Sequence, residues 1–192
     1  MDNIDAVFEE LKNRSVLNEG IKLIMKAGIP TLQASFLFNE IYCNPSFSNS
    51  DKDILRFMLL HEAGHKQNPT YEYLLIFVLF LSYIILHLFL KISTVDKILL
   101  FFLLSVLEYR LFFPFLRKSE FNADIYASKK MIEVYRVKKP SIISRKSFKE
   151  LKKVNFKLNL LNLVFGRIDY HPKPEERAQR IKEFEESRMI KY

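Results

Sequence analysis

Two residue types are scarce in this chain, and their scarcity narrows the folds open to it. The 192 residues include one cysteine, Cys43, and four glycines. A single cysteine excludes an internal disulfide and is typical of a reducing compartment, and we expect Cys43 to be a small apolar residue in a strand. So few glycines disfavour a turn-rich all-β fold. Residues 1–16 are polar and acidic rather than basic and then apolar, so no secretory signal is predicted there.

The motif HEAGH at residues 61–65 is the strongest functional signal in the sequence. The apolar residues before it recur with helical spacing, so we expect the motif on a helix. Residues four apart on a helix share a face, where His61 and His65 would bind one zinc ion and Glu62 would reach a water molecule beside it. Gly64 removes bulk next to the second histidine, which indicates either room for a close neighbour or a simple packing glycine.

A zinc site needs a third protein ligand, and the motif EFNAD at residues 120–124 supplies a candidate. Glu120 and Asp124 are also four apart, and the apolar residues beside them predict a second amphipathic helix. In this interpretation Glu120 is the third ligand. Asp124 accepts a hydrogen bond from the outer nitrogen of a ligand histidine and so orients its ring. Isolated ExxxD pairs are common on solvated helices, so the prediction depends on the presence of HEAGH upstream.

A third segment follows these two motifs, with His171-Pro172 and then Glu175-Glu176-Arg177. In this order the three segments resemble the membrane metallopeptidase family of HtpX and the CAAX prenyl endopeptidases, over about residues 30–184. Members of that family are zinc-dependent gluzincins that cut membrane or misfolded proteins, or prenylated peptides. HtpX-type members usually carry a membrane hairpin before HExxH. This chain has no apolar run there, so it resembles a short or divergent member.

The resemblance also implies a cofactor and a role for each site residue. The cofactor is Zn²⁺, and the implied ligands are His61, His65 and Glu120. Glu62 would be the general base, and His171 with Arg177 would lie near the developing oxyanion. Arg117 resembles a basic residue that is common in the family motif. Taken alone, His171 would be an ordinary surface histidine, and the order of the motifs favours a role in the site.

Two apolar runs, residues 73–90 and 98–116, predict a transmembrane helical hairpin. The first run has no formal charge and is long enough to cross a bilayer. The second is apolar apart from Glu108 and Arg110. Two crossings would return Glu120 to the side of the membrane where HEAGH lies, whereas one crossing would separate the two halves of the site. The alternative is a pair of helices buried in a soluble core.

The net charge of +8 is concentrated in residues 129–157, where eleven lysines and arginines accompany only Glu133 and Glu150. Basic segments that flank membrane spans tend to stay in the cytoplasm and are attracted to anionic lipids. We therefore expect an integral protein of the cell membrane with its catalytic site on the cytoplasmic side. A solvated helical face is the alternative. No recognised nucleic-acid-binding module accompanies the charge, so we expect no nucleic-acid partner.

The segment before HEAGH is expected to contain helices and then strands. Residues 3–13 and 16–27 have helical spacing, and residues 35–38 and 41–43 are predicted as two short strands. In gluzincins a strand just before the zinc helix pairs with the extended substrate at the edge of a sheet. Either predicted strand is open to that role. For the N-terminal helices, a pro-segment that covers the site is the alternative.

Together these features predict a mainly α (α+β) protein, with a zincin-like catalytic domain, a small edge β-sheet and an inserted transmembrane helical hairpin. The expected units are an N-terminal helical segment, a two-piece catalytic domain and the hairpin, at residues 1–28, 29–70 with 117–192, and 71–116. The predicted function is a membrane-anchored zinc endopeptidase that hydrolyses peptide bonds of membrane or misfolded proteins. Its partners would be a polypeptide substrate and the lipid bilayer. The competing hypothesis is a catalytically silent zinc-binding membrane protein that binds unfolded or membrane chains, and the presence of Glu62 argues against it.

Overall fold

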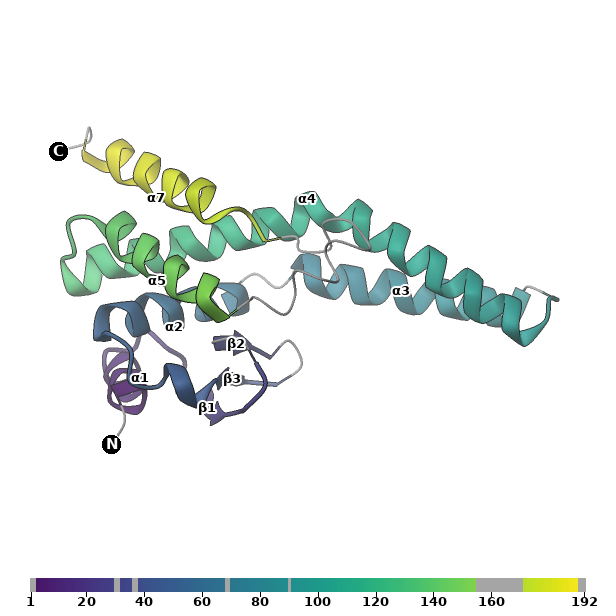
Figure 1. The fold of residues 1–192 in the computed structure, drawn as a ribbon, viewed down its shortest axis with the longest axis horizontal. Coiled ribbons are helices and arrows are strands. Elements are labelled where there is room, and N and C mark those ends of the chain that lie inside the picture. The colour runs from purple at the N-terminus through teal and green to yellow at the C-terminus, as the bar shows by residue number, and fades with distance from the viewer. Residues whose placement is uncertain are drawn as a thin grey trace.

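Helices form most of the molecule and accompany one small sheet (Figure 1). The computed structural model describes residues 3–29, 32–35, 38–67, 70–89, 91–154 and 171–189. Within these ranges the chain forms helices and a three-stranded sheet, which confirms the predicted mainly α (α+β) class. The elements are arranged as a cluster of helices with the sheet at one end, and a long two-helix hairpin that extends away from it (Figure 1).

The first helix belongs to the core of this cluster. α1 spans Asn3–Asn13, as predicted, and its buried residues recur at helical spacing: Ile4, Val7, Phe8 and Leu11. They pack against α2, which spans Lys52–Gln67 and carries HEAGH. The 3-10 turn η1 at Pro45–Phe47 precedes α2. Asp51 then caps α2, since its side chain accepts a hydrogen bond from the backbone N–H of Asp53 at 2.9 Å.

The prediction of a helix over residues 16–27 is wrong, because part of this segment forms a strand. β1 spans Lys22–Met25 and pairs in parallel with β3, which spans Glu40–Cys43. The pairing places Leu23 beside Ile41. Such pairing between residues distant in sequence overrides a weak local preference for helix.

β2 is an edge strand of the sheet. It spans Leu32–Ala34 and pairs antiparallel with β3, so the strand order is β1-β3-β2. The strand predicted over residues 35–38 thus lies earlier in the chain, and residues 36–37 are outside the described residues. The other predicted strand, residues 41–43, is confirmed within β3, where Cys43 is buried as expected.

Two helices joined by a short turn form the hairpin (Figure 1). α3 spans Thr70–Phe89 and packs along α4, which spans Thr94–Tyr135. The hydroxyl of Ser93 caps α4 by accepting a hydrogen bond from the backbone N–H of Asp96 at 3.2 Å. Within the hairpin, the hydroxyl of Ser82 on α3 donates to the carboxylate of Glu108 on α4.

The hairpin exposes its apolar side chains. Large apolar residues face outward along α4 from Val95 to Phe115, and the most apolar stretch of this helix contains no buried residue. α4 is long and apolar enough to cross a membrane, whereas the apolar stretch of α3, Tyr73–Leu88, is shorter. The two helices are therefore not buried in a soluble core, and their exposure fits association with a membrane.

α4 continues without a break from the hairpin into the helical cluster. The predicted second span, residues 98–116, and the predicted helix that contains Glu120 are parts of one helix. The expected boundary between residues 116 and 117 therefore falls inside a helix. In its second half the buried face includes small side chains, Ser119, Ala123, Ala127 and Ser128, which allow α4 to lie close to α2.

Two more helices complete the described part of the cluster. α5 spans Pro140–Val154 and α7 spans Pro174–Met189, and each begins with a proline, which suits a first turn where no N–H is needed. The carboxylate of Glu185 on α7 accepts hydrogen bonds from the backbone N–H and the hydroxyl of Ser141, at 2.6 and 2.9 Å. Residues 155–170 lie outside the described residues.

Candidate metal centre

A close approach of α2 and α4 brings the predicted ligands together. Gly64 of α2 faces Ala123 of α4, and a Cβ added at Gly64 would lie 2.8 Å from the Cα of Ala123. Non-bonded carbon atoms are normally about 3.5–4.0 Å apart, so a side chain at this position would force the helices apart. Of the two interpretations of Gly64, the structure therefore supports room for a close neighbour. Glu120, nearly one turn before Ala123, thereby faces His61 and His65.

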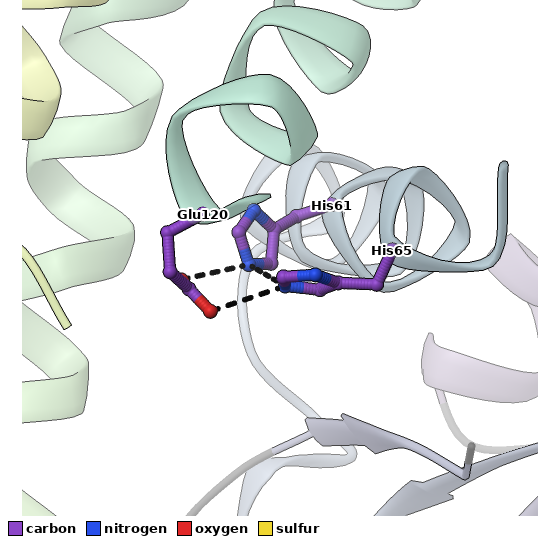
Figure 2. Close-up of side chains that lie close together, drawn as sticks. All are labelled: His61, His65 and Glu120. Atoms are coloured by element: carbon purple, nitrogen blue, oxygen red, sulfur yellow. Dashed lines mark hydrogen bonds and ion pairs between the residues drawn. The ribbon is translucent and has the colours of Figure 1, made fainter. Parts of the chain in front are cut away.

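Figure 2 shows the side chains of His61 and His65 from α2 and of Glu120 from α4 converging on one point. The Nε2 atoms of the two histidines are 3.2 Å apart. Oε1 of Glu120 lies 3.2 Å from Nε2 of His65, and Oε2 lies 3.5 Å from Nε2 of His61. The group is nearly removed from solvent, because the most exposed of the three side chains, His65, is only 13% exposed.

The spacing of these donor atoms fits a zinc ion. Zinc binds nitrogen and oxygen at about 2.0–2.2 Å, so neighbouring ligands of a tetrahedral site are about 3.3–3.6 Å apart. Here the two Nε2 atoms are 3.2 Å apart, and each lies within this range or close to it of one carboxylate oxygen of Glu120, Oε1 at 3.2 Å from His65 and Oε2 at 3.5 Å from His61. Oε2 of Glu120 is buried and has no hydrogen-bond partner among the described residues, and a cation would satisfy this acceptor. Two imidazoles and one carboxylate also leave one coordination position open.

The outer nitrogen of each histidine faces a second residue. Nδ1 of His61 lies 3.0 Å from Oδ1 of Asp124, the neighbour expected from the sequence. Nδ1 of His65 lies 3.3 Å from the hydroxyl of Ser119, which sequence reasoning missed. Both contacts turn Nε2 toward Glu120 and so fix the orientation of the rings. The signal for Ser119 in the sequence is a hydroxyl residue directly before Glu120.

Arg177 of α7 completes a buried charged network behind His61. Its Nε and Nη2 atoms lie 2.7 and 2.6 Å from the two carboxylate oxygens of Asp124. Burial opposes the charge of Asp124, but Arg177 outweighs it and holds the pKa of Asp124 below its usual value. Burial also opposes the charge of Glu120, yet His65 and His61 hold its pKa well below the usual range. Both carboxylates are therefore charged, as a metal ligand and its supporting group must be.

The two residues expected near the oxyanion lie on different sides of the centre. Nε2 of His171 is 3.5 Å from Oε1 of Glu120, and the His171 side chain is 48% exposed. The side chain of Arg177 is only 8% exposed, and its Nη1 lies 3.4 Å from Oε2 of Glu120. His171 thus lies on the solvent side and Arg177 on the buried side. Arg117, also suggested by the resemblance, pairs with Glu176 of α7 at 2.6 Å.

Glu62 lies between α2 and the edge strand of the sheet. Its Oε2 accepts a hydrogen bond from the backbone N–H of Ala34 in β2 at 2.7 Å. The backbone N–H of Ser35 instead donates to the carbonyl oxygen of Glu40 in β3. Since the N–H groups of neighbouring residues in a strand point in opposite directions, the N–H of Ala34 points to the free edge of the sheet. The side chain of Glu62 is therefore directed to the side of α2 where an extended peptide would add to the sheet. No sequence pattern indicates this contact, because the donor is a backbone N–H, which almost every residue type has.

These features define the class of protein as an HExxH metallopeptidase: a helix with two histidines and a glutamate, a carboxylate from a second helix, and a strand edge alongside. The family model of peptidase family M48 matches residues 11–185, and the chain belongs to this family. The protein is thus a metallopeptidase by family, with polypeptides as its substrates, and M48 peptidases are zinc-dependent. A closer relation to HtpX or to the CAAX prenyl endopeptidases stays a prediction. Comparisons with curated proteins and with solved structures found no match.

Proposed function

We propose that this protein is a membrane-anchored zinc endopeptidase whose metal is held by His61, His65 and Glu120. The observation that carries the proposal is the convergence of these three side chains, whose nearest nitrogen and oxygen atoms are 3.2–3.5 Å apart. Glu62 lies on the same helix as the two histidines and contacts the edge strand of the sheet. A zinc site with three protein ligands and an adjacent carboxylate is the arrangement used for peptide hydrolysis.

In this proposal each group around the centre has its own role in the reaction. Zinc, when bound, supplies a Lewis acid that polarises the substrate carbonyl and acidifies water. Glu62 takes a proton from the water molecule as the water oxygen attacks the carbonyl carbon. Glu62 then gives that proton to the leaving nitrogen as the C–N bond breaks, so that one residue acts as base and then as acid. The edge of β2, where the N–H of Ala34 is held by Glu62, would orient the extended substrate through its other outward-facing backbone groups.

His171 and Arg177 have different parts in this proposal. The exposed imidazole of His171 lies on the open side of the centre, where it would donate a hydrogen bond to the developing oxyanion. The guanidinium of Arg177 is already engaged by Asp124, with both of its short contacts made to that carboxylate. We therefore assign Arg177 to holding Asp124, and through it the ring of His61, in position.

The exposed apolar surface of α4 supports anchoring in a bilayer. The rise from Val95 to Phe115 is about 30 Å at 1.5 Å per residue, which equals the usual thickness of the hydrocarbon core. Glu120 lies five residues beyond Phe115, about 8 Å further along the helix axis. The centre would thus lie at the level of the lipid headgroups. Arg117, directly beyond the apolar stretch, supports placement on the cytoplasmic side.

This depth supports a preference for membrane-anchored polypeptides that are cut close to their span. An extended chain covers about 3.3 Å per residue, so a bond two to four residues outside a span would reach the centre. A series of anchored peptides with spacers of increasing length, reconstituted with the protein in liposomes, tests this. Cut sites at a constant distance from the bilayer are expected, and equal cleavage of free soluble peptides would refute the preference.

Glu62→Gln tests the chemistry. The amide oxygen of glutamine still accepts the hydrogen bond from Ala34 but cannot act as a base. Zinc should therefore remain bound while cleavage falls by about 10²-fold or more. Glu9→Gln, at an exposed position of α1, is the matched control and should cleave normally. If the unchanged chain binds zinc but cleaves nothing, the silent zinc-binding protein is the correct alternative.

The predicted topology has its own test. Single cysteines at Ser93 and Lys138, both exposed, would be placed in a Cys43→Ser background. A membrane-impermeant thiol reagent added to intact cells should label position 93 and should label position 138 only after lysis. Labelling of both positions from the same side would show that α3 and α4 do not form a spanning hairpin.

A further inference from the structure

Lys66 of α2 holds the backbone that follows the edge strand. It directly follows His65, and its ammonium group donates to the carbonyl oxygens of Ser35 at 2.9 Å and of Phe38 at 2.7 Å. The hydroxyl of Ser35 in turn accepts a hydrogen bond from the N–H of Phe38 at 3.2 Å. One lysine therefore binds the backbone at both Ser35 and Phe38.

Glu62 and Lys66 are four residues apart, so they lie on the same face of α2. Glu62 binds the N–H of Ala34, and Lys66 binds the carbonyl of the next residue, Ser35. This helix face thus holds two successive backbone positions with one acceptor and one donor. Because His65 lies between them on the same helix, the edge strand and the metal ligands are held by one rigid element.

We propose that Lys66 is a positioning residue for substrate binding, which keeps the free edge of β2 at a fixed place beside the metal centre. The proposal rests on the proposed endopeptidase activity, since it concerns recognition of the substrate at that site. Without Lys66 the histidines keep their own supports, Asp124 and Ser119. The loss should therefore affect binding of an extended peptide more than binding of zinc or transfer of the proton.

Lys66→Met tests the proposal, because methionine keeps an aliphatic side chain and loses the donor. Hydrogen bonds from a charged group correspond to about 10- to 100-fold in an equilibrium, so we expect KM to rise by at least about tenfold with kcat and zinc content little changed. Amide exchange at Ala34 and Phe38 should become faster by a similar factor. Lys66→Arg retains donors and should restore both properties, and Lys52→Met, at the exposed start of α2, is the matched control.

Each result has a distinct meaning when the full chain is measured in detergent micelles. Unchanged amide exchange in Lys66→Met would overturn the proposal, whether or not the protein cleaves peptides. Loss of zinc or a fall in kcat at constant KM would also overturn it, since Lys66 would then act on the metal centre. Faster exchange in a protein whose unchanged form cleaves nothing would support the role of Lys66 in holding the strand and would contradict the proposed endopeptidase activity.

Discussion

Replacing Gly64 with alanine tests whether the close approach of α2 and α4 builds the metal centre. The added Cβ would lie 2.8 Å from the Cα of Ala123, and 3.2 Å from both its Cβ and its carbonyl oxygen. An ordinary carbon–carbon contact of about 3.5–4.0 Å requires the atoms to separate by about 0.7–1.2 Å. Backbone atoms are among these neighbours, so the helices themselves must move.

A displacement of this size is large for a metal site. Ligand positions must hold to within about 0.2 Å, and here α2 carries His61 and His65 while α4 carries Glu120. We expect zinc affinity to fall by about tenfold or more. Stability should change less, because overpacking costs about 1–3 kcal/mol while alanine is favoured over glycine within a helix by about 1 kcal/mol. The expected net loss is about 0–2 kcal/mol.

Competition with a chelator measures the zinc affinity of Gly64→Ala, and thermal unfolding of the zinc-free protein measures its stability. Gly20→Ala is the control, since the nearest atom to a Cβ at Gly20 would be Oδ1 of Asn18 at 3.4 Å, an ordinary contact. The control should bind zinc like the unchanged protein. Zinc affinity in Gly64→Ala equal to that of the unchanged protein would refute the reasoning.

Three further changes test other parts of the structure. Arg177→Lys keeps the charge but loses the paired contacts with Asp124, so zinc affinity and kcat should fall together by about tenfold or more, as measured by chelator competition and steady-state cleavage. Glu185→Gln removes the charged acceptor at the start of α5 and should lower the free energy of unfolding by about 1 kcal/mol in urea titrations. Burial raises the pKa of Cys43 to about 11, so its neutral thiol should react with iodoacetamide at neutral pH far more slowly in the folded protein than in the unfolded one.

The two halves of the cluster of His61, His65 and Glu120 could be predicted from the sequence because the geometry within each half is local. His61 with His65, and Glu120 with Asp124, are each four apart on a helix, so each pair lies on one face whatever the rest of the chain does. The backbone donor of Ala34 could not be predicted, since it depends on where β2 lies relative to α2. The same holds for β1, whose helical spacing is overridden by pairing with β3.

The continuity of α4 from the hairpin into the helical cluster was not predicted, for a different reason. Arg117 and Lys118 mark a change from apolar to charged surroundings, and both residues are good helix formers. Neither ends a helix, so α4 continues through them to Tyr135. The change from an apolar to a charged stretch of sequence therefore does not mark the end of a helix here.

The continuity of α4 also bears on the basic stretch that follows it. Lys129 lies 14 residues beyond Phe115, about 21 Å along the axis, and salt screens charges over about 8 Å at physiological ionic strength. With α4 along the bilayer normal, Lys129 would be too far from the headgroups to bind anionic lipid, and a tilt of about 70° would be needed to bring it within 8 Å. Spanning helices are tilted by about 20° on average. If α4 spans a bilayer in this way, its basic residues nearest to the headgroups would be Arg117 and Lys118, directly beyond the apolar stretch.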